Sequence, residues 1–427
     1  MGLAILLGLF FAGVLIGIPV AFAMAISAVA AFHYEGFPML IAFQRITSGV
    51  TIFSLLAIPF FIFAGELMLH GGIARRLVRF ASTLVGHVRG GLASVNIFSS
   101  MLFGGISGSA VADISALGSL MIPVMKEKGY HGDYAVNVTV TSSIAGVVIP
   151  PSHNMIIYSV AAGGGLSISS LFLAGVLPGF LMCICLAIAA YVIAIKRNYP
   201  SEPFPGMREV LVSAAAALPG FVTAVIIVGG VLSGVFTVTE SGAFGAIYAL
   251  VLTGLVYRSL DWQSFKLAVV TSVRTTAMVM ILIGAANAFG YLLALYNVPE
   301  LLATALSAVS ENPLVIILMI NLILLMLGMI MDMAALILIC TPIFLPIAVG
   351  LGMDPIQFGV MLLMNLGLGL CTPPVGTCLF VGCAVGKVPI EQAVRTIWPF
   401  YLAMLAALLL VAYVPAVSMW LPGLLEG

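Results

Sequence analysis

The sequence predicts an all-α polytopic membrane protein. Apolar residues make up 63% of the 427 positions, and charged residues make up only 7%. Soluble domains are about 45–50% apolar and about 25% charged. Apolar runs that reach the ~20 residues needed to cross a bilayer recur along the whole chain, and the longest are interrupted by Gly or Pro. A single core in water cannot bury this much apolar surface, so we expect the chain to fold in a membrane.

The composition also excludes several classes of function. Net charge is zero and there is no long basic run, so nucleic-acid binding has no electrostatic basis. The six cysteines lie in apolar or Gly/Pro-rich stretches without the spacing of a zinc site or a disulfide framework, and we expect small buried side chains. A GxxxxGK[ST] nucleotide-binding loop is absent from the sequence. No cofactor is expected, and the chain cannot hydrolyse ATP by that route.

The apolar segments predict the order of the membrane elements. They cover residues 3–32, 48–68, 91–125, 134–164, 170–195, 212–234, 238–257, 276–296, 313–350, 356–386 and 397–421. The first is long for one helix and short for two, and we favour two short helices that break near Gly17-Ile18-Pro19. Segments 70–90 and 259–274 are predicted interfacial arms, either a rigid collar around a fixed scaffold or ordinary amphipathic connectors.

An internal repeat divides the chain at about residue 198. Pro150-Pro151 and Pro373-Pro374 are 223 residues apart, and so are Pro123 and Pro346. Around each pair a Gly-containing tip, an apolar arm, a polar turn and a Pro-Pro break follow in the same order. The predicted repeats are 1–198 and 199–427. Each contains a re-entrant helical hairpin (about 91–125 and about 313–350) and a broken transmembrane helix (about 134–164 and about 356–386).

The basic residues predict that the two repeats are inverted. Arginines and lysines flank the first hairpin, whereas only acidic residues flank the second. Since cytoplasmic loops are enriched in Lys and Arg, the two hairpins should enter the membrane from opposite faces. Inverted repeats of this kind build alternating-access carriers, with the substrate near the midplane of the membrane.

The two hairpin tips are the first candidate binding regions. Glycine lets the backbone leave the helix, and the hydroxyls, freed carbonyls and carboxylates of the tips are hard oxygen ligands that suit Na⁺. A small-residue packing face is the alternative. Asp113 and Asp332 lie inside apolar stretches, where an insertion cost of about 2.5–3.5 kcal/mol favours a functional role. Each could also be a helix N-cap, and for Glu240 we favour capping.

The two Pro-Pro breaks are the second candidate binding regions. Two prolines free backbone carbonyls, and a broken helix presents a positive N-terminal end that suits a substrate carboxylate. A mere kink is the alternative. The predicted substrate- and ion-binding residues are Ser107, Gly108, Ser109, Asp113, Pro150, Pro151, Ser152, Asn154, Gly328, Asp332, Thr372, Pro373, Pro374, Gly376 and Thr377. Na⁺ is expected at four of them, Ser107, Ser109, Asp332 and Thr372. No catalytic residue is predicted, because the adjacent Ser152 and His153 would face different directions on a helix.

At these motifs the chain resembles the large membrane subunit of tripartite ATP-independent periplasmic (TRAP) transporters. The resemblance rests on Gly-Ile-Ser-Gly-Ser-Ala-Val-Ala-Asp (105–113), Ile-Pro-Pro-Ser (149–152), Phe-Thr-Val-Thr-Glu (236–240) and Thr-Pro-Pro-Val-Gly (372–376). It implies Na⁺-driven import of a small organic acid across the bacterial inner membrane by an elevator motion, as in the ion transporter superfamily. It also implies a small four-helix membrane subunit and a periplasmic solute-binding protein as partners, in addition to membrane lipid.

Three other functions remain open from the residues alone. A self-sufficient Na⁺/dicarboxylate carrier would share the hairpins and broken helices but need no binding protein. A channel could also be built from hairpins that meet in the membrane, and an intramembrane enzyme would need a nucleophile and base at membrane depth. The sequence does not identify the organic acid, since many acids present the same carboxylate.

Overall fold

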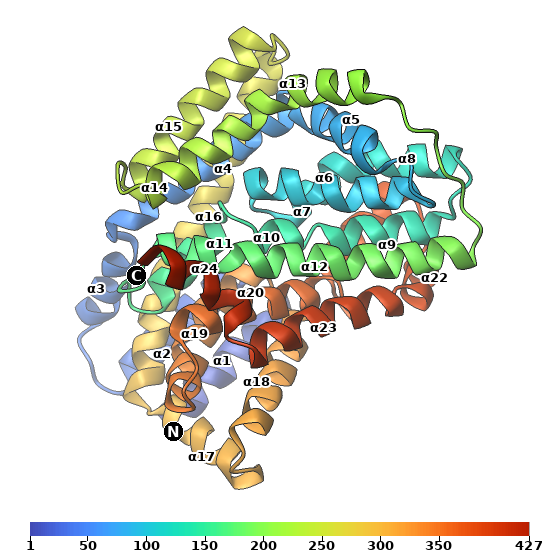
Figure 1. Ribbon diagram of the computed structural model, residues 1–427. Helices are drawn as coiled ribbons and strands as arrows, with labels where there is room; N and C mark the ends of the chain where they lie inside the picture. The colour runs from blue at the N-terminus through green and yellow to red at the C-terminus, as the bar shows by residue number, and fades with distance from the viewer. Residues whose placement is uncertain (427) are drawn as a thin grey trace.

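The computed structural model describes residues 1–426, and all regular elements within that range are helices (Figure 1). Six described helices are long and apolar enough to cross a membrane, and up to ten spans result if each strongly bent pair counts as one. The prediction of an all-α polytopic membrane protein is confirmed at this level.

The N-terminal segment forms two helices, as predicted. α1 (Gly2–Ile16) and α2 (Val20–Tyr34) pack against each other. Gly17 ends α1 with a φ of 91°, a left-handed conformation that costs glycine little. Pro19 directly precedes α2, where its missing N–H removes no helical hydrogen bond. The break therefore follows from two adjacent local signals.

Three helices lie largely or wholly outside the predicted segments: α3 (Met39–Val50), α17 (Val298–Val309) and α22 (Ile390–Thr396). α3 exposes a run of polar side chains, and α17 begins with Pro299 and Glu300. All three are too short or too polar to register in a search for membrane-spanning runs. The short turn η1 (Phe53–Leu56) leads from α3 into α4 (Ala57–His70).

The first predicted arm is confirmed as a helix and the second is not a separate element. α5 (Ile73–Val85) buries Ile73 and Leu77 and exposes Arg75 and Arg79. Residues 259–274, by contrast, mostly belong to α16 (Trp262–Leu295), one continuous 34-residue helix. Neither Pro nor Gly occurs in α16 before Gly284, so nothing local breaks the helix where the charged stretch ends.

The segments predicted as hairpins and broken helices consist of the following helices. The first hairpin comprises α6 (Gly91–Ser107), α7 (Ala110–Asp113), the π-helical turn η2 (Ile114–Gly118) and α8 (Ser119–Glu127). The first broken helix comprises α9 (Gly132–Ser142), α10 (Ala145–Val148) and α11 (His153–Ala161), bent by 54°. The second half has the hairpin α18 (Pro313–Gly328) and α19 (Met333–Gly350), then α20 (Pro355–Leu370) and α21 (Thr377–Gly386).

The remaining helices connect and flank these units. They are α12 (Ile168–Lys196), α13 (Met207–Ala224) with η3 (Val225–Gly229) and α14 (Gly230–Leu232), α15 (Val238–Val251) with η4 (Leu252–Val256), α22 (Ile390–Thr396), α23 (Trp398–Tyr413) and α24 (Ala416–Glu426). At the start of α15, Thr237 and Glu240 form a complete capping box, which confirms the capping role of Glu240.

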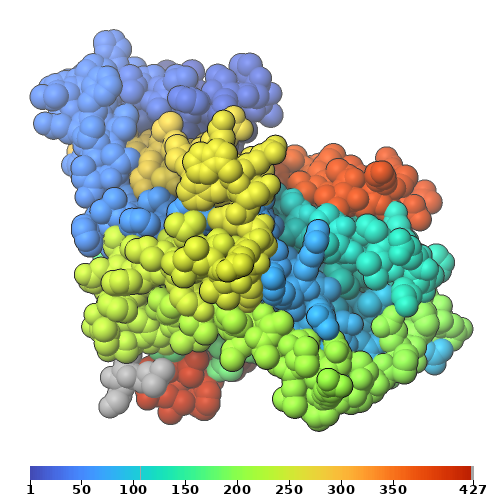
Figure 2. All heavy atoms as spheres, turned by 90° about the horizontal axis from the view of Figure 1, so that it is seen from above, coloured from blue at the N-terminus to red at the C-terminus, as the bar shows by residue number. Residues whose placement is uncertain are grey.

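The helices form a central group and a flanking group, which meet where α4 and α5 pack on α6 and where α16 packs on α19. α12 packs against α6, α10, α20, α23 and α24, whereas α13 packs against α5 and α15, and α4 against α15 and α16. Figure 2 shows the early residues and the yellow-green segment around α13–α15 along one side of the molecule, with the teal and orange segments of the two halves on the other. The hairpins and broken helices thus share one core, and α16 runs alongside it.

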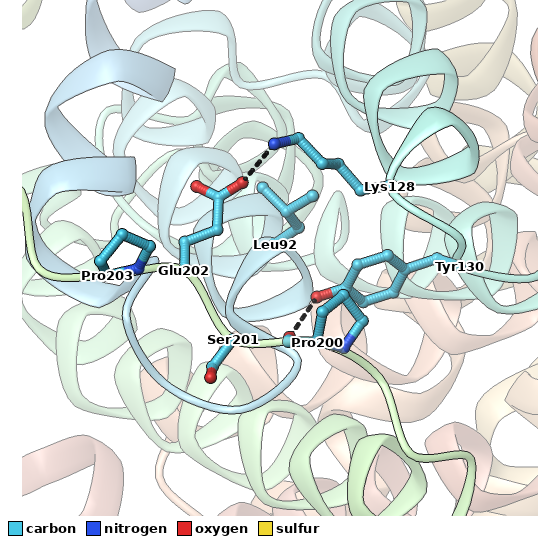
Figure 3. A pocket seen from close by; sticks show the side chains of 7 residues that line it. All are labelled: Leu92, Lys128, Tyr130, Pro200, Ser201, Glu202 and Pro203. Carbon is cyan, nitrogen blue, oxygen red and sulfur yellow. Dashed lines mark hydrogen bonds and ion pairs between the residues drawn. The ribbon is translucent and has the colours of Figure 1, made fainter.

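The segment between α12 and α13, residues 197–206, runs past Lys128 and Tyr130 (Figure 3). Lys128 pairs with Glu202 at 3.0 Å, and the Tyr130 hydroxyl donates to the Pro200 carbonyl at 3.4 Å. Arg197 donates two hydrogen bonds to the Asp133 carboxylate, at 3.0 and 3.2 Å. The segment is therefore fastened to the loop that joins the first hairpin to the first broken helix.

Candidate functional site

The tip of the first hairpin is a tight turn between two helices. Gly108 ends α6 with a φ of 61°, a conformation that favours glycine. Ser109 is the N-cap of α7, and its Oγ accepts from the Ala112 N–H at 3.4 Å. The Ser107 Oγ lies 3.5 Å from the Ser109 nitrogen. The two serines therefore hold their hydroxyls at the turn.

The tip of the second hairpin has a carboxylate where the first has a hydroxyl. Asp332 caps α19 and accepts from the Ala334 N–H at 3.1 Å, which confirms the capping alternative for this residue. Its counterpart, 223 residues earlier, is Ser109. The capping alternative is wrong for Asp113, which ends α7 one turn after its cap. In the sequence Asp113 and Asp332 look equivalent, because each follows a glycine-containing tip.

Asp113 is buried without a hydrogen-bond partner. Its residue exposure is 0%, and neither carboxylate oxygen meets hydrogen-bond geometry with a group in the described part of the chain, although Ser100 lies near. The π-helical turn η2 begins at the next residue, and such turns often mark functional sites. An unpartnered carboxylate at this depth is costly and needs a functional explanation.

The first Pro-Pro break is joined to the first hairpin tip. The Pro150-Pro151 peptide bond is cis, and the chain then enters α11 through Ser152. The Asn154 amide donates to the Gly108 carbonyl at 3.2 Å. The Ser152 hydroxyl is buried and has no partner among the described residues. The break therefore places a polar side chain against the freed carbonyl of the tip.

The second Pro-Pro break is joined to the second tip through the backbone. The Pro373-Pro374 bond is also cis, and Gly376 precedes α21 with a φ of 48°. The Val375 and Gly376 N–H groups donate to the Met329 carbonyl at 3.2 and 3.3 Å. The Thr372 hydroxyl donates to the Leu368 carbonyl at 2.8 Å, and the same carbonyl accepts from the Cys371 N–H at 3.1 Å.

Paired glycines bring each hairpin onto its broken helix. A Cβ added to Gly104 would lie 2.0 Å from the Gly146 Cα, and one added to Gly369 would lie 2.6 Å from the Gly328 Cα. A side-chain hydrogen bond joins the same two elements in each half. The Ser142 hydroxyl donates to the Ser100 hydroxyl at 3.0 Å, and the Asn365 amide donates to the Asn321 side-chain carbonyl at 2.8 Å. Each hairpin and its broken helix therefore form one closely packed unit.

All four elements meet at one cavity of about 550 Å³. Four of the predicted residues line it: Ser109, Asn154, Asp332 and Thr377. His153 lines it as well. The other eleven predicted residues do not line it: Ser107, Gly108, Asp113, Pro150, Pro151, Ser152, Gly328, Thr372, Pro373, Pro374 and Gly376. Of the four residues expected to bind Na⁺, Ser109 and Asp332 therefore face the same space.

The opposite wall of this central cavity was missed by the sequence analysis. It comes from the start of α2, at Pro19–Phe22, and from one face of α16 between Thr275 and Leu282. These stretches are apolar and look like any other membrane helix. The only local signal was the Gly17–Pro19 break, which places the start of α2 inside the membrane.

Most residues that line the central cavity are apolar, and a few polar residues stand at the ends of helices that reach it. No Lys or Arg is among its described lining residues. The N-terminal ends of α11, α19 and α21 reach it through Asn154, Asp332 and Thr377. Helix N-termini carry partial positive charge, and a carboxylate with hydroxyls offers hard oxygen ligands. This arrangement can hold a small anion and a small cation close together.

The comparisons with known proteins agree on one family. Residues 7–417 match the family described as "Tripartite ATP-independent periplasmic transporter, DctM component". The chain is 41% identical to the sialic acid TRAP transporter large permease protein SiaM of Vibrio cholerae, over 99% of this chain and 97% of that one. It is 40% identical to the C4-dicarboxylate TRAP transporter large permease protein DctM of Pseudomonas aeruginosa, over 87% and 86%.

The fold also resembles that of a solved transporter. The crystal structure of the Alcanivorax borkumensis YdaH transporter superposes with a TM-score of 0.66 and 14% identity, over 90% of this chain and 89% of that chain. At this identity the likeness concerns the fold alone. With the family match over nearly its whole length, the chain belongs to the TRAP transporters as their large membrane permease subunit, the DctM component.

Proposed function

We propose that this chain imports a small organic acid across the bacterial inner membrane, coupled to Na⁺. The observation that carries the proposal is the central cavity, where two hairpin tips and two helix breaks face α2 and α16. The N-termini of α11 and α21 would attract the substrate carboxylate, and Asp332 with Ser109 would contribute oxygen ligands to Na⁺. The relatives named for sialic acid and C4-dicarboxylates indicate the class of acid.

The movement we propose is an elevator built on two inverted repeats, 1–198 and 199–427. The central group, with both hairpins and both broken helices, would move as one block against α2, α4, α5, α13, α15 and α16. The paired glycine contacts support this, because they make each hairpin and its broken helix one packed unit. The flanking helices would hold the small four-helix membrane subunit. A periplasmic solute-binding protein would deliver the acid to the outer face.

The test is uptake of radiolabelled sialic acid and succinate into proteoliposomes that contain this chain, its small membrane subunit and its binding protein. We expect uptake with inward Na⁺ and loss of uptake when K⁺ or choline replaces Na⁺. Undiminished uptake under a proton gradient alone would contradict the proposed coupling to Na⁺. Uptake that persists without the binding protein would favour the self-sufficient carrier instead.

A further inference from the structure

One arginine is separated from all other basic residues. Of the 15 Lys and Arg, 14 fall within 75–89, 126–128, 196–208, 258–274 and 387–395, and the fifteenth is Arg45. Contacts join these five clusters to one another: Arg76 over the Tyr257 ring, Arg79 with Glu209, Lys128 with Glu202, and Lys126 with the Gly386 carbonyl. The 14 therefore mark one end of the molecule, the cytoplasmic end by the usual charge bias.

Arg45 lies at the other end. Its guanidinium sits 4.0 Å from the centre of the Tyr291 ring, near the C-terminal end of α16, whereas Lys266 lies near the N-terminal end. The 25 residues between Lys266 and Tyr291 correspond to roughly 37 Å of helix, more than the thickness of a bilayer core. Arg45 is thus the one residue among the Lys and Arg that is expected on the outer face of this permease.

The Arg45 guanidinium is free to bind an anion. Its side chain is exposed, and it takes part in none of the four ion pairs of the described chain. Glu35, an acid at the same end, accepts from the Tyr296 hydroxyl instead. Stacking on Tyr291 fixes the guanidinium in place and leaves its N–H groups available.

A cavity of about 330 Å³ borders Tyr291, the residue on whose ring Arg45 stacks, although Arg45 itself is not among the lining residues. Tyr291, Gly290 and Asn287 of α16 line it, together with Gly49 of α3. Neither the Asn287 amide nor the Tyr291 hydroxyl makes a hydrogen bond within the described residues. Gly49 lets the two helices approach, since a Cβ there would lie 2.8 Å from the Asn287 Cβ. The cavity therefore combines two unpartnered polar groups with an adjacent positive charge.

This outer cavity continues the line of the central one. α11, α16 and α19 line both cavities: the central one with their parts nearer Asn154, Met278 and Asp332, the outer one with parts farther along each helix. From Met278 to Asn287 is nine residues, or roughly 13 Å along α16. The two cavities thus lie on one seam between the central group and the flanking helices.

We propose that Arg45, Asn287 and Tyr291 form an outer carboxylate-binding site, where the organic acid is held before it reaches the central cavity. The inference rests on the proposed function and adds a substrate contact to it. Arg45 binds the carboxylate through paired N–H groups, and the Asn287 amide and Tyr291 hydroxyl bond the polar groups of the acid. No Lys or Arg is among the described lining residues of the central cavity, so Arg45 supplies a guanidinium charge that the central cavity lacks.

The test compares Arg45→Gln with Arg75→Gln in the complete reconstituted transporter. Both arginines are exposed, and each variant removes one positive charge, but Arg75 lies at the cytoplasmic end. Uptake is measured with whichever of radiolabelled sialic acid and succinate the wild type accumulates. We expect Arg45→Gln to raise the KM about tenfold or more, because the loss of one charge-assisted hydrogen bond weakens binding by about that factor. The maximal rate should stay within about twofold of the wild-type rate. Arg75→Gln should leave both unchanged.

Two further measurements separate this role from others. Added salt should raise the KM of the wild type and leave that of Arg45→Gln nearly constant, because screening acts on the Arg45 charge. Docking of the binding protein, followed by surface plasmon resonance, should be equal for both variants and the wild type. Weaker docking that parallels the rise in KM would instead make Arg45 a protein-docking residue and overturn the proposal.

The outcomes also distinguish this site from the transport function itself. An active wild type whose Arg45→Gln variant keeps its KM within about twofold would overturn the outer site and leave the proposed function intact. An equal rise in KM for Arg75→Gln would also overturn it, since net charge would then explain the effect. A wild type that accumulates neither acid would overturn the proposed function for sialic acid and C4-dicarboxylates, and with it the outer site for these acids.

Discussion

The two hairpins share a backbone plan and distribute their carboxylates differently. Each second arm begins at an N-cap, Ser109 in the first half and Asp332 in the second. Four residues later comes Asp113 in the first half and Leu336 in the second, both almost fully buried. The carboxylate of the first half is thus buried one helical turn after the tip, whereas the carboxylate of the second half lines the central cavity. Repetition of the backbone therefore does not repeat the chemistry.

Leu336→Asp is the substitution with the largest expected effect, because it copies the first-half pattern into the second. It would bury a carboxylate with no partner in an apolar environment, which we expect to cost about 3–5 kcal/mol. Thermal unfolding of purified protein in detergent, with yield of folded protein, measures the loss. Leu336→Asn introduces a side chain of about the size of Asp without its charge, so it should lower the stability less than Leu336→Asp does. If Leu336→Asp melts like the wild type, burial alone does not make Asp113 exceptional.

Asp332→Asn tests whether the second-half carboxylate acts in transport or only as a cap. Asn caps helices as well as Asp, so the variant should insert and melt like the wild type. Uptake should fall at least about tenfold, because the charge that faces the central cavity is gone. Asp354→Asn is a matched control, since Asp354 caps α20 by a 2.7 Å bond to the Ile356 N–H away from the cavity. Equal uptake by both variants would leave Asp332 a cap alone.

The two glycine contacts should differ in their tolerance of a methyl group. A Cβ at Gly104 would meet the Gly146 Cα at 2.0 Å, whereas a Cβ at Gly328 would meet the Gly369 Cα at 3.2 Å. Gly104→Ala should therefore destabilise the protein by about 1–3 kcal/mol through overpacking. Gly328→Ala should change stability by less than about 1 kcal/mol, since Ala also favours the helix. Melting in detergent compares the two, and equal losses would contradict the difference in spacing.

Local signals account for the parts of the fold that the sequence predicted correctly. The Gly17–Pro19 break, the capping box at Thr237–Glu240 and the two Pro-Pro breaks each depend on a few neighbouring residues. The prediction of a separate arm at 259–274 was wrong because charged residues alone do not end a helix, and α16 continues through most of this stretch without a break. α3, α17 and α22 were missed because short or polar helices leave no membrane-spanning signal.

The amino-acid sequence alone predicted that the protein spans a membrane, where its helices break, and which polar residues stand at the breaks. Composition and short-range backbone chemistry decide those features. Helix packing was needed to show that Asp332 faces the central cavity while Asp113 is buried, and that α2 and α16 form the opposite wall. It also brought Arg45 onto Tyr291, a residue 246 positions away. Such contacts depend on which face each helix turns toward its neighbours, and that is set by packing across the whole molecule rather than by any local pattern.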